Sequence, residues 1–190
     1  MILPKERDPR FTTIRRGGTL TDDDHRLLAL WAADCAEHVL PWFEAVRPDD
    51  DRPRRAIETG RAWARGEVTM TAAHNAAFTA NAAAREVAGT AREAAHAAGQ
   101  AAPVAHVAAH ALGAAAYALR AVRAAATADG GNDGTPDQAV LAESRWQRDR
   151  LPDGLRDLVL DDMSRRNDLC WGVFTPLLTD LADVAATCSH

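Results

Sequence analysis

Histidine is the residue type in this chain with the clearest chemical potential, because imidazole titrates near neutral pH and binds metals. His106 and His110 are four residues apart, which places both rings on one face of a helix that we expect over 103–128. Gly113 and Tyr117 continue that face at spacings of three and four. The pair can serve as metal ligands, as hydrogen-bonded core residues, or as part of a ligand- or partner-binding surface.

A metal site needs more ligands than this pair supplies. Two histidines can hold zinc only with a third ligand and usually a fourth. The chain has no HExxH motif, and no acid follows the pair before Asp129. We therefore predict no metal and no cofactor. Both rings should be at least half buried and hydrogen-bonded, with partners such as His74, Asn75 and Glu58 on preceding helices.

Catalytic motifs are missing from the sequence. There is no GxSxG elbow, and no glycine-rich loop precedes a helix as in a phosphate-binding loop. Cys35 and His38 are three residues apart, so a nucleophile and its base are conceivable. Trp31 and Val39 fall on the same helical stripe, which favours burial instead. The sequence favours a protein without enzymatic activity.

Charged residues surround one tryptophan of a predicted helix. Glu58, Arg61, Arg65 and Glu67 lie near Trp63 and alternate in sign. Such a pattern is typical of a solvated helix face, and it also suits a recognition surface built on an aromatic anchor.

A second binding hypothesis uses the small side chains of the middle third. Alanine leaves room between helices, and pockets between helices with a few converging polar groups are common ligand sites. His106, His110, Tyr117 and Trp63 can line such a pocket, with His74 close by. The chain would then sequester or modify a small molecule.

The elements that position these residues are helices. The chain has 190 residues, of which 47% are hydrophobic but only 5% aromatic, because alanine dominates. Alanine is the best helix former and allows helices to approach closely. We expect an all-α, single-domain bundle of about six to seven helices with an Ala-rich centre, or alternatively a short α-solenoid. The five tryptophans are the expected core anchors.

Breakers and capping residues predict the boundaries. Residues 1–20 read as an N-terminal arm, 21–190 as a single helical domain, and 129–136 as its clearest loop. Thr21 caps the first helix, Pro53 begins another, and a capping-box pattern at Thr90 begins a third. The expected helices are 21–40, 54–65, 69–89, 90–99, 103–128, 136–151 and 155–181.

Charge and hydropathy argue against two classes of partner, nucleic acids and membranes. The net charge is −5, and most arginines lie within a few residues of an acid, which argues against nucleic acid. The N-terminus shows no apolar signal region, and no stretch approaches the ~20 apolar residues of a membrane span. Three widely spaced cysteines without a CxxC pair fit reduced thiols. We expect a cytoplasmic protein without membrane contacts, and no pattern indicates an oligomeric state.

Several segments together resemble a known family. The motifs lie in the arm, in the first two helices, in the histidine segment and near the end of the chain: 3–11, 13–18, 30–36, 52–58, 61–67, 105–111 and 151–152. The most distinctive is Arg-Pro-Arg at 52–54 followed by Trp-Ala-Arg-Gly-Glu at 63–67. In these segments the chain resembles the Imm-5-like family of immunity proteins, whose members occur in actinobacteria.

The resemblance implies a function by binding. An immunity or self-resistance protein neutralises a protein toxin or a toxic small molecule inside the producing cell. It needs a rigid scaffold, anchor side chains and charge complementary to the target. The net charge of −5 suits a basic toxin such as a nuclease. The family brings no established catalytic residues, so none are carried over.

Overall fold

The computed structural model describes residues 8–128, 130, 135–166 and 173–175. Within these residues the chain is all-α, as predicted, with eight α-helices and three short 3₁₀-helices, and its only β feature is an isolated bridge between Thr13 and Leu20. The α-helices are α1 (Asp22–Val39), α2 (Pro41–Glu44), α3 (Arg52–Ala64), α4 (Met70–Arg85), α5 (Gly89–Ala101), α6 (His110–Ala128), α7 (Thr135–Asp149) and α8 (Asp153–Arg166).

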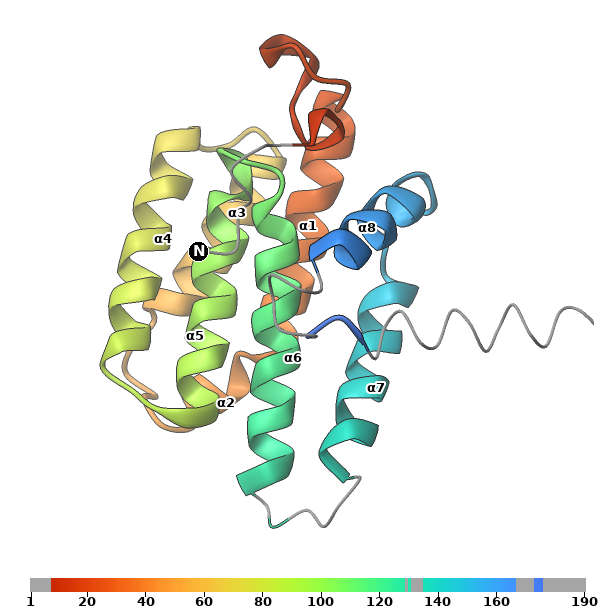
Figure 1. The fold of residues 1–190 in the computed structure, drawn as a ribbon. Helices are drawn as coiled ribbons and strands as arrows, with labels where there is room; N and C mark the ends of the chain where they lie inside the picture. The colour runs from red at the N-terminus through yellow and green to blue at the C-terminus, as the bar shows by residue number, and fades with distance from the viewer. Residues whose placement is uncertain (1–7, 129, 131–134, 167–172, 176–190) are drawn as a thin grey trace, which may run out of the picture.

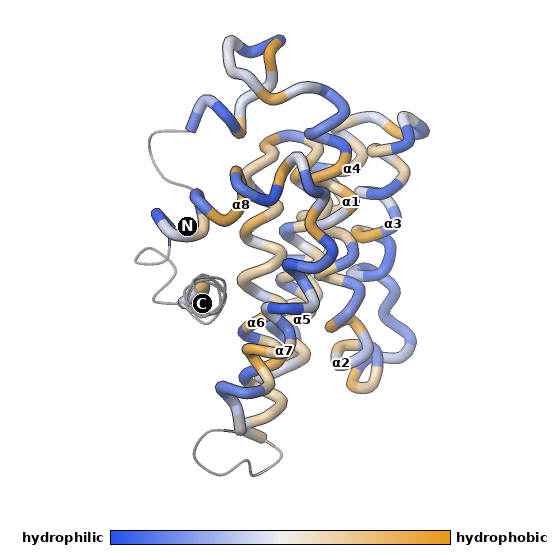
Figure 2. Tube along the Cα trace, turned by 90° about the vertical axis from the view of Figure 1, so that its right-hand side faces the viewer, coloured by the Kyte–Doolittle hydropathy of each residue, from blue (hydrophilic) through white to orange (hydrophobic). Residues whose placement is uncertain are grey.

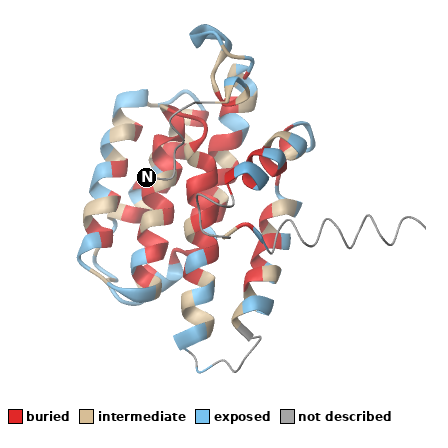
Figure 3. Cartoon of the chain, in the orientation of Figure 1, coloured by how far each residue is buried: buried red, intermediate tan, exposed pale blue. Residues whose placement is uncertain are grey.

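The helices form a bundle around α5 and α6. α4, α5 and α6 lie side by side, α1 and α3 pack behind them, and α7 lies on the other side of α6 (Figure 1). α5 and α6 both contact α1, which is distant in sequence. These contacts make a bundle and not the alternative solenoid, in which each repeat would touch only its neighbours. Buried residues concentrate on α1, α5 and α6 (Figure 3).

α5 and α6 are antiparallel, and three polar contacts show their register. Glu93 pairs with Arg120 at 2.9 Å between carboxylate and guanidinium. The rings of His96 and Tyr117 lie 5.0 Å apart between centroids. At one end of the helix pair, the His110 ring is hydrogen-bonded to the Gln100 side chain at 2.9 Å. The space between these contacts is filled by alanines, which bring the helices close (Figure 2 shows pale orange along both).

The large anchors are fewer than the sequence predicted. Trp31 is buried in the core, and Trp63 and Trp146 pack against it while partly exposed. Trp42 is 37% exposed, so its prediction as a core anchor is wrong. It follows Pro41, which begins the single turn α2, and that turn buries Phe43 instead. Trp171 lies outside the described residues.

Several predicted helix starts are confirmed by their caps. The Thr21 hydroxyl accepts a hydrogen bond from the Asp24 amide at 3.0 Å, and Thr69 accepts one from the Ala72 amide at 3.2 Å. Pro53 occupies the first turn of α3. These signals depend only on neighbouring residues, which is why the sequence shows them.

The predicted helix over 103–128 is wrong in its first turns. α5 continues through Gly99 to Ala101 and runs into η3 (Ala102–Ala105), which contains Pro103. A turn over 106–109 follows, and α6 begins only at His110. Gly99 does not end its helix. Its missing side chain makes room for Asn81, whose amide would lie 2.7 Å from an added Cβ.

The N-terminal segment folds onto the bundle at both of its ends. Residues 8–20 contain η1 (Pro9–Phe11) and η2 (Ile14–Arg16) and bury Phe11 and Leu20. Asp8 pairs with Arg165 of α8 at 2.5 Å. The segment is therefore held against α8 at one end and at the start of α1 at the other. None of the helices in the described part of the chain is long and apolar enough to cross a membrane.

Candidate functional site

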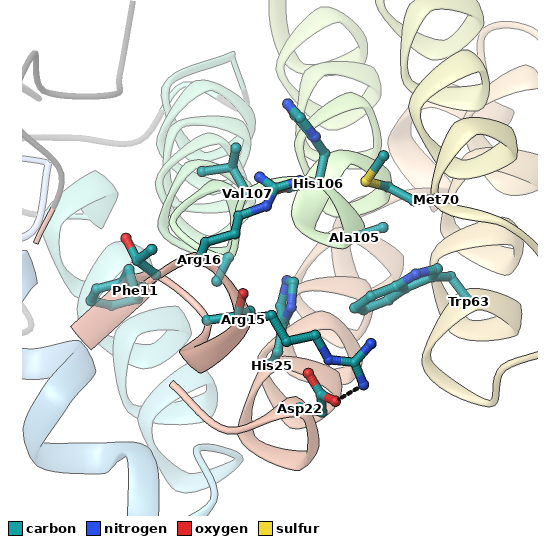
Figure 4. A pocket seen from close by; sticks show the side chains of 13 residues that line it. Phe11, Arg15, Arg16, Asp22, His25, Trp63, Met70, Ala105, His106 and Val107 are labelled. Atoms are coloured by element: carbon teal, nitrogen blue, oxygen red, sulfur yellow. Dashed lines mark hydrogen bonds and ion pairs between the residues drawn. The ribbon is translucent and has the colours of Figure 1, made fainter. Parts of the chain in front are cut away.

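A pocket of about 240 Å³ lies where the N-terminal segment meets the ends of several helices (Figure 4). The segment supplies one wall and the turn after η3 the opposite one. Two side chains of α1 and one each of α3 and α4 complete the pocket. Its main lining residues are Phe11, Arg15, Arg16, Asp22, His25, Trp63, Met70, His106 and Val107.

Two guanidinium groups form the cationic wall. Arg15 pairs with Asp22 at the start of α1. Arg16 extends toward the turn over 106–109, where it donates one hydrogen bond of 3.4 Å to the backbone carbonyl of His106. That distance exceeds the usual range for a strong hydrogen bond. Most arginines of this chain pair with carboxylates, but no carboxylate pairs with Arg16 among the described residues.

His25 forms the inner surface between α1 and η3. Its Nε2 donates to the carbonyl of Val104 at 2.6 Å, because a carbonyl can only accept. Its ring meets Trp63 edge-on with 4.8 Å between centroids. Burial lowers the pKa of His25 below its ordinary value, against the opposing effect of the Val104 carbonyl. The ring is thus neutral at pH 7.

A line of aromatic and sulfur-containing side chains leads from the pocket along α4. Met70, His74 and Phe78 are spaced four residues apart and share one face of the helix. The His74 ring lies 4.8 Å from that of Phe78 and 5.4 Å from that of His106. Phe78 is 62% exposed and Met70 38%. We name these three residues of α4 together with His106 the α4 stripe.

Comparison with known proteins identifies the family. The family model described as Imm-5 like putative immunity protein matches residues 18–154, well over half of the chain. The chain belongs to this family. No curated protein and no solved structure matches it. The matched range includes His25, Trp63 and the α4 stripe, whereas Arg15 and Arg16 precede it.

Of the predicted site residues of this family member, the structure brings three together. Trp63 and His106 line the pocket, and His74 lies directly beside His106. The prediction that His106 and His110 share one helix face is wrong, because His106 lies in the turn before α6. Proline at position 103 and the turn that follows separate the two rings.

His110 and Tyr117 lie in the contact between α5 and α6. The prediction that His106 and His110 are at least half buried is confirmed, since both are partly buried with well under half of their surface exposed. His110 donates from Nδ1 to Gln100 at 2.9 Å, which confirms its predicted hydrogen bond. The partner comes from α5, the helix before, and not from His74, Asn75 or Glu58.

Arg61 and Glu58 lie on α3, outside the pocket. Arg61 donates to Asp34 at 2.6 Å and to Glu37 at 2.7 Å, and both acids belong to α1. The hydrogen bond from Arg61 holds the pKa of Glu37 below its usual range. Arg61 thus joins two helices. Glu58 is exposed on the same helix.

Cys35 and His38 do not form a catalytic pair in the structure. Cys35 is fully buried, and burial raises the pKa of its thiol well above the ordinary value. His38 is bonded to Glu143 of α7 at 2.7 Å. Cys170 and Cys188 lie outside the described residues. Within the described residues, no group of three or more His, Cys, Asp or Glu side chains is arranged to hold a metal ion.

The site contains residues that sequence reasoning did not select. Arg15, Arg16 and His25 belong to the arm and to the first turn of α1, where spacing indicated only caps and breakers. The sequence contains only a weak signal for Arg15 and Arg16 as site residues. Two adjacent arginines precede two glycines, and a chain reversal at Gly17, whose φ is 83°, turns this pair back onto the bundle.

Proposed function

We propose that this protein is an immunity protein that neutralises a toxin by binding it, without catalysis of its own. The observation that carries the proposal is membership of the immunity family over residues 18–154. The geometry supports it, because the pocket and the α4 stripe form one surface with exposed anchors beside a hollow. Such a surface is typical of binding sites in which a few aromatic or apolar residues contribute most of the affinity.

The contact surface that we propose for the toxin is the α4 stripe. Exposed large apolar side chains that gather on one face mark interaction sites more often than scattered ones do. Phe78 and Met70 are exposed on the same helix face as His74. α4 packs on α3 and α5, whose contacts are filled with small residues, so the stripe sits on a rigid support.

Toxin neutralisation can be tested by co-expression. Toxins encoded beside the gene are produced in a sensitive host with and without this protein, and growth is measured. Wild-type protein should restore growth against one of them. The proposal fails if none of the neighbouring toxins is neutralised.

A matched pair of variants tests the contact surface. Phe78 and Val46 are similarly exposed, at 62% and 59%, but Val46 follows α2 and lies outside the pocket and the α4 stripe. Phe78→Asp should weaken toxin binding at least about tenfold, the effect of about 1.4 kcal/mol. Val46→Asp should leave it unchanged. Equal affinities for both variants would place the contact elsewhere.

A second candidate function is sequestration of a toxic small molecule, and the pocket favours it. Its volume of about 240 Å³ lies below the roughly 300–1,000 Å³ of pockets for drug-sized ligands, so the ligand would be small. A panel of metabolites in a thermal-shift assay tests this candidate. A flat response across the panel, with tight binding of a protein toxin, would remove it.

A further inference from the structure

We propose that the pocket between the N-terminal segment and η3 is a binding site for a carboxylate. The proposal goes beyond toxin neutralisation, because it names the chemical group that the pocket accepts. The group can belong to an acidic side chain of a protein partner or to a free small carboxylate. The proposal is supported by the sign of the lining charges, by the few hydrogen bonds of the Arg16 guanidinium, and by the apolar wall across from it.

The charges of the lining match a monoanion. Arg15 and Arg16 are positive, Asp22 is negative, and His25 is the neutral ring of the inner surface. Asp22 already compensates Arg15. The remaining positive charge is that of Arg16, so one carboxylate balances the pocket and a dianion would exceed it.

Arg16 has the hydrogen-bonding capacity that a carboxylate requires. A guanidinium carries five N–H donors in a planar fork that suits a carboxylate. Within the described part of the chain, Arg16 donates one hydrogen bond, in a long contact of 3.4 Å to the His106 carbonyl. Arg52 provides a contrast at the other end of α3 from Trp63, where its guanidinium donates to Asp50 and Glu86 at 2.6–2.9 Å. An incoming carboxylate would give Arg16 the kind of partner that Arg52 already has.

The other side of the pocket suits the body that carries the carboxylate. Trp63 and Met70 lie across from Arg16, as Figure 4 shows. The hydrogen bond of His25 to Val104 and its edge-on contact fix the inner ring against Trp63. A short planar or apolar group can therefore rest on Trp63 while its carboxylate reaches Arg16.

Titration with benzoate tests the site in the intact protein. Binding is followed by ¹H–¹⁵N NMR on the backbone amides of 13–16 and 105–108, with benzyl alcohol and benzamidinium as neutral and cationic probes of similar shape. Benzoate should shift these amides and the other two probes should not. Equal responses to all three probes would overturn the proposal.

Two variants with the same charge change separate a specific contact from the net charge. Arg16→Gln should weaken benzoate binding at least about tenfold, which corresponds to about 1.4 kcal/mol. Arg85→Gln removes an exposed arginine from the last turn of α4, outside the pocket lining, and should leave binding unchanged. Equal benzoate affinities in the two variants would overturn the proposal even if both fold normally.

The same variants identify the source of the carboxylate. If a neighbouring toxin is neutralised, its affinity is measured for wild type, Arg16→Gln and Arg85→Gln. A tenfold loss confined to Arg16→Gln assigns the carboxylate to an acidic side chain of the toxin. An unchanged toxin affinity with Arg16-dependent benzoate binding assigns it to a free carboxylate. Arg16-dependent benzoate binding without any neutralised toxin would support the site while the immunity function fails.

Discussion

The contact between α5 and α6 and the contact between α1 and α7 bury helices in opposite ways. α5 and α6 meet through alanine and glycine, with polar side chains only at intervals. α1 and α7 are joined by large side chains. The Trp31 indole donates to the backbone carbonyl of Gln147 at 2.9 Å, and the Gln147 amide donates to Glu143 at 2.8 Å.

The difference shows two sources of specificity in one small protein. Small residues let helix backbones approach, but each alanine buries little area, so the contact depends on the absence of anything larger. Large residues bury more area per side chain, but their polar atoms need partners in the interior. The buried carboxylate of Glu143 has such a partner in His38, which is partly exposed. The His38 ring also stacks on Trp146, with 3.8 Å between the ring centroids.

The largest effect should come from truncating the anchor between α1 and α7. Trp31→Ala removes a buried indole and the shorter of two hydrogen bonds to the Gln147 carbonyl, leaving only the Arg150 amide at 3.3 Å among the described residues, which should cost about 3–5 kcal/mol of the free energy of unfolding. Trp42→Ala is the control, because Trp42 is 37% exposed, and it should cost less than about 1 kcal/mol. Urea denaturation measures both. Similar losses would show that Trp31 is not the anchor.

The opposite change tests the contact between α5 and α6. Ala97 is fully buried and lies on the helix face of Glu93 and Gln100, which contact α6. Ala97→Leu should overpack this contact and cost about 1–3 kcal/mol. Ala142→Leu, at an exposed position of α7, should stay within about 0.5 kcal/mol of wild type. A tolerated leucine at 97 would mean that the helices can separate without loss.

Two buried glycines sharpen the comparison further. A Cβ on Gly113 would lie 2.6 Å from the Gln100 side-chain oxygen that binds His110, so Gly113→Ala should displace it and cost about 1 kcal/mol. A Cβ on Gly60 of α3 meets Ala101 and Ala102 at ordinary distances of 3.5 Å or more. Gly60→Ala should therefore stabilise by about 0.5–1 kcal/mol through helix propensity. Calorimetric unfolding distinguishes the two, and effects of the same sign would contradict the close-approach argument.

The smallest effect concerns pH and a histidine of the α5–α6 contact. Burial lowers the pKa of His96, although Glu93 acts in the opposite direction. The unfolded chain then binds a proton more readily than the folded one, so stability should be full above about pH 6.5 and fall as the pH decreases. His96→Gln should reduce this loss, measured by urea denaturation at pH 7.5 and 5.5. An equal loss in wild type and variant would assign the pH dependence to other groups.

Local signals in the sequence predicted the helices better than their junctions. Thr21 caps α1 as expected, because an N-cap interacts with the next three residues only. The predicted capping box at Thr90 is wrong, since α5 begins at Gly89 after Ala88, which makes no side-chain cap hydrogen bond. Gly99 and Pro103 were expected to end one helix and begin the next. In the structure Gly99 makes room for Asn81 of another helix, and Pro103 sits in η3, so both serve contacts that local patterns do not contain.

The candidate site was predicted only in part for the same reason. Trp63 and His106 were selected because aromatic and histidine side chains carry binding energy or charge wherever they lie. Arg16 and His25 join them only after the N-terminal segment turns back at Gly17 and packs near η3. Sequence spacing cannot show that the segment packs there, because the residues that come into contact are up to 90 positions apart.

The sequence by itself determined the fold class and the family of this protein. Alanine content and capping residues favour helices through short-range energetics, and the family model matches residues 18–154 of the sequence. The tertiary structure decided which side chains meet. The antiparallel register of α5 and α6 placed His110 on Gln100, and the turn over 106–109 placed His106 in the pocket with Arg16. Both outcomes follow from packing between distant segments, whose free energy no local pattern encodes.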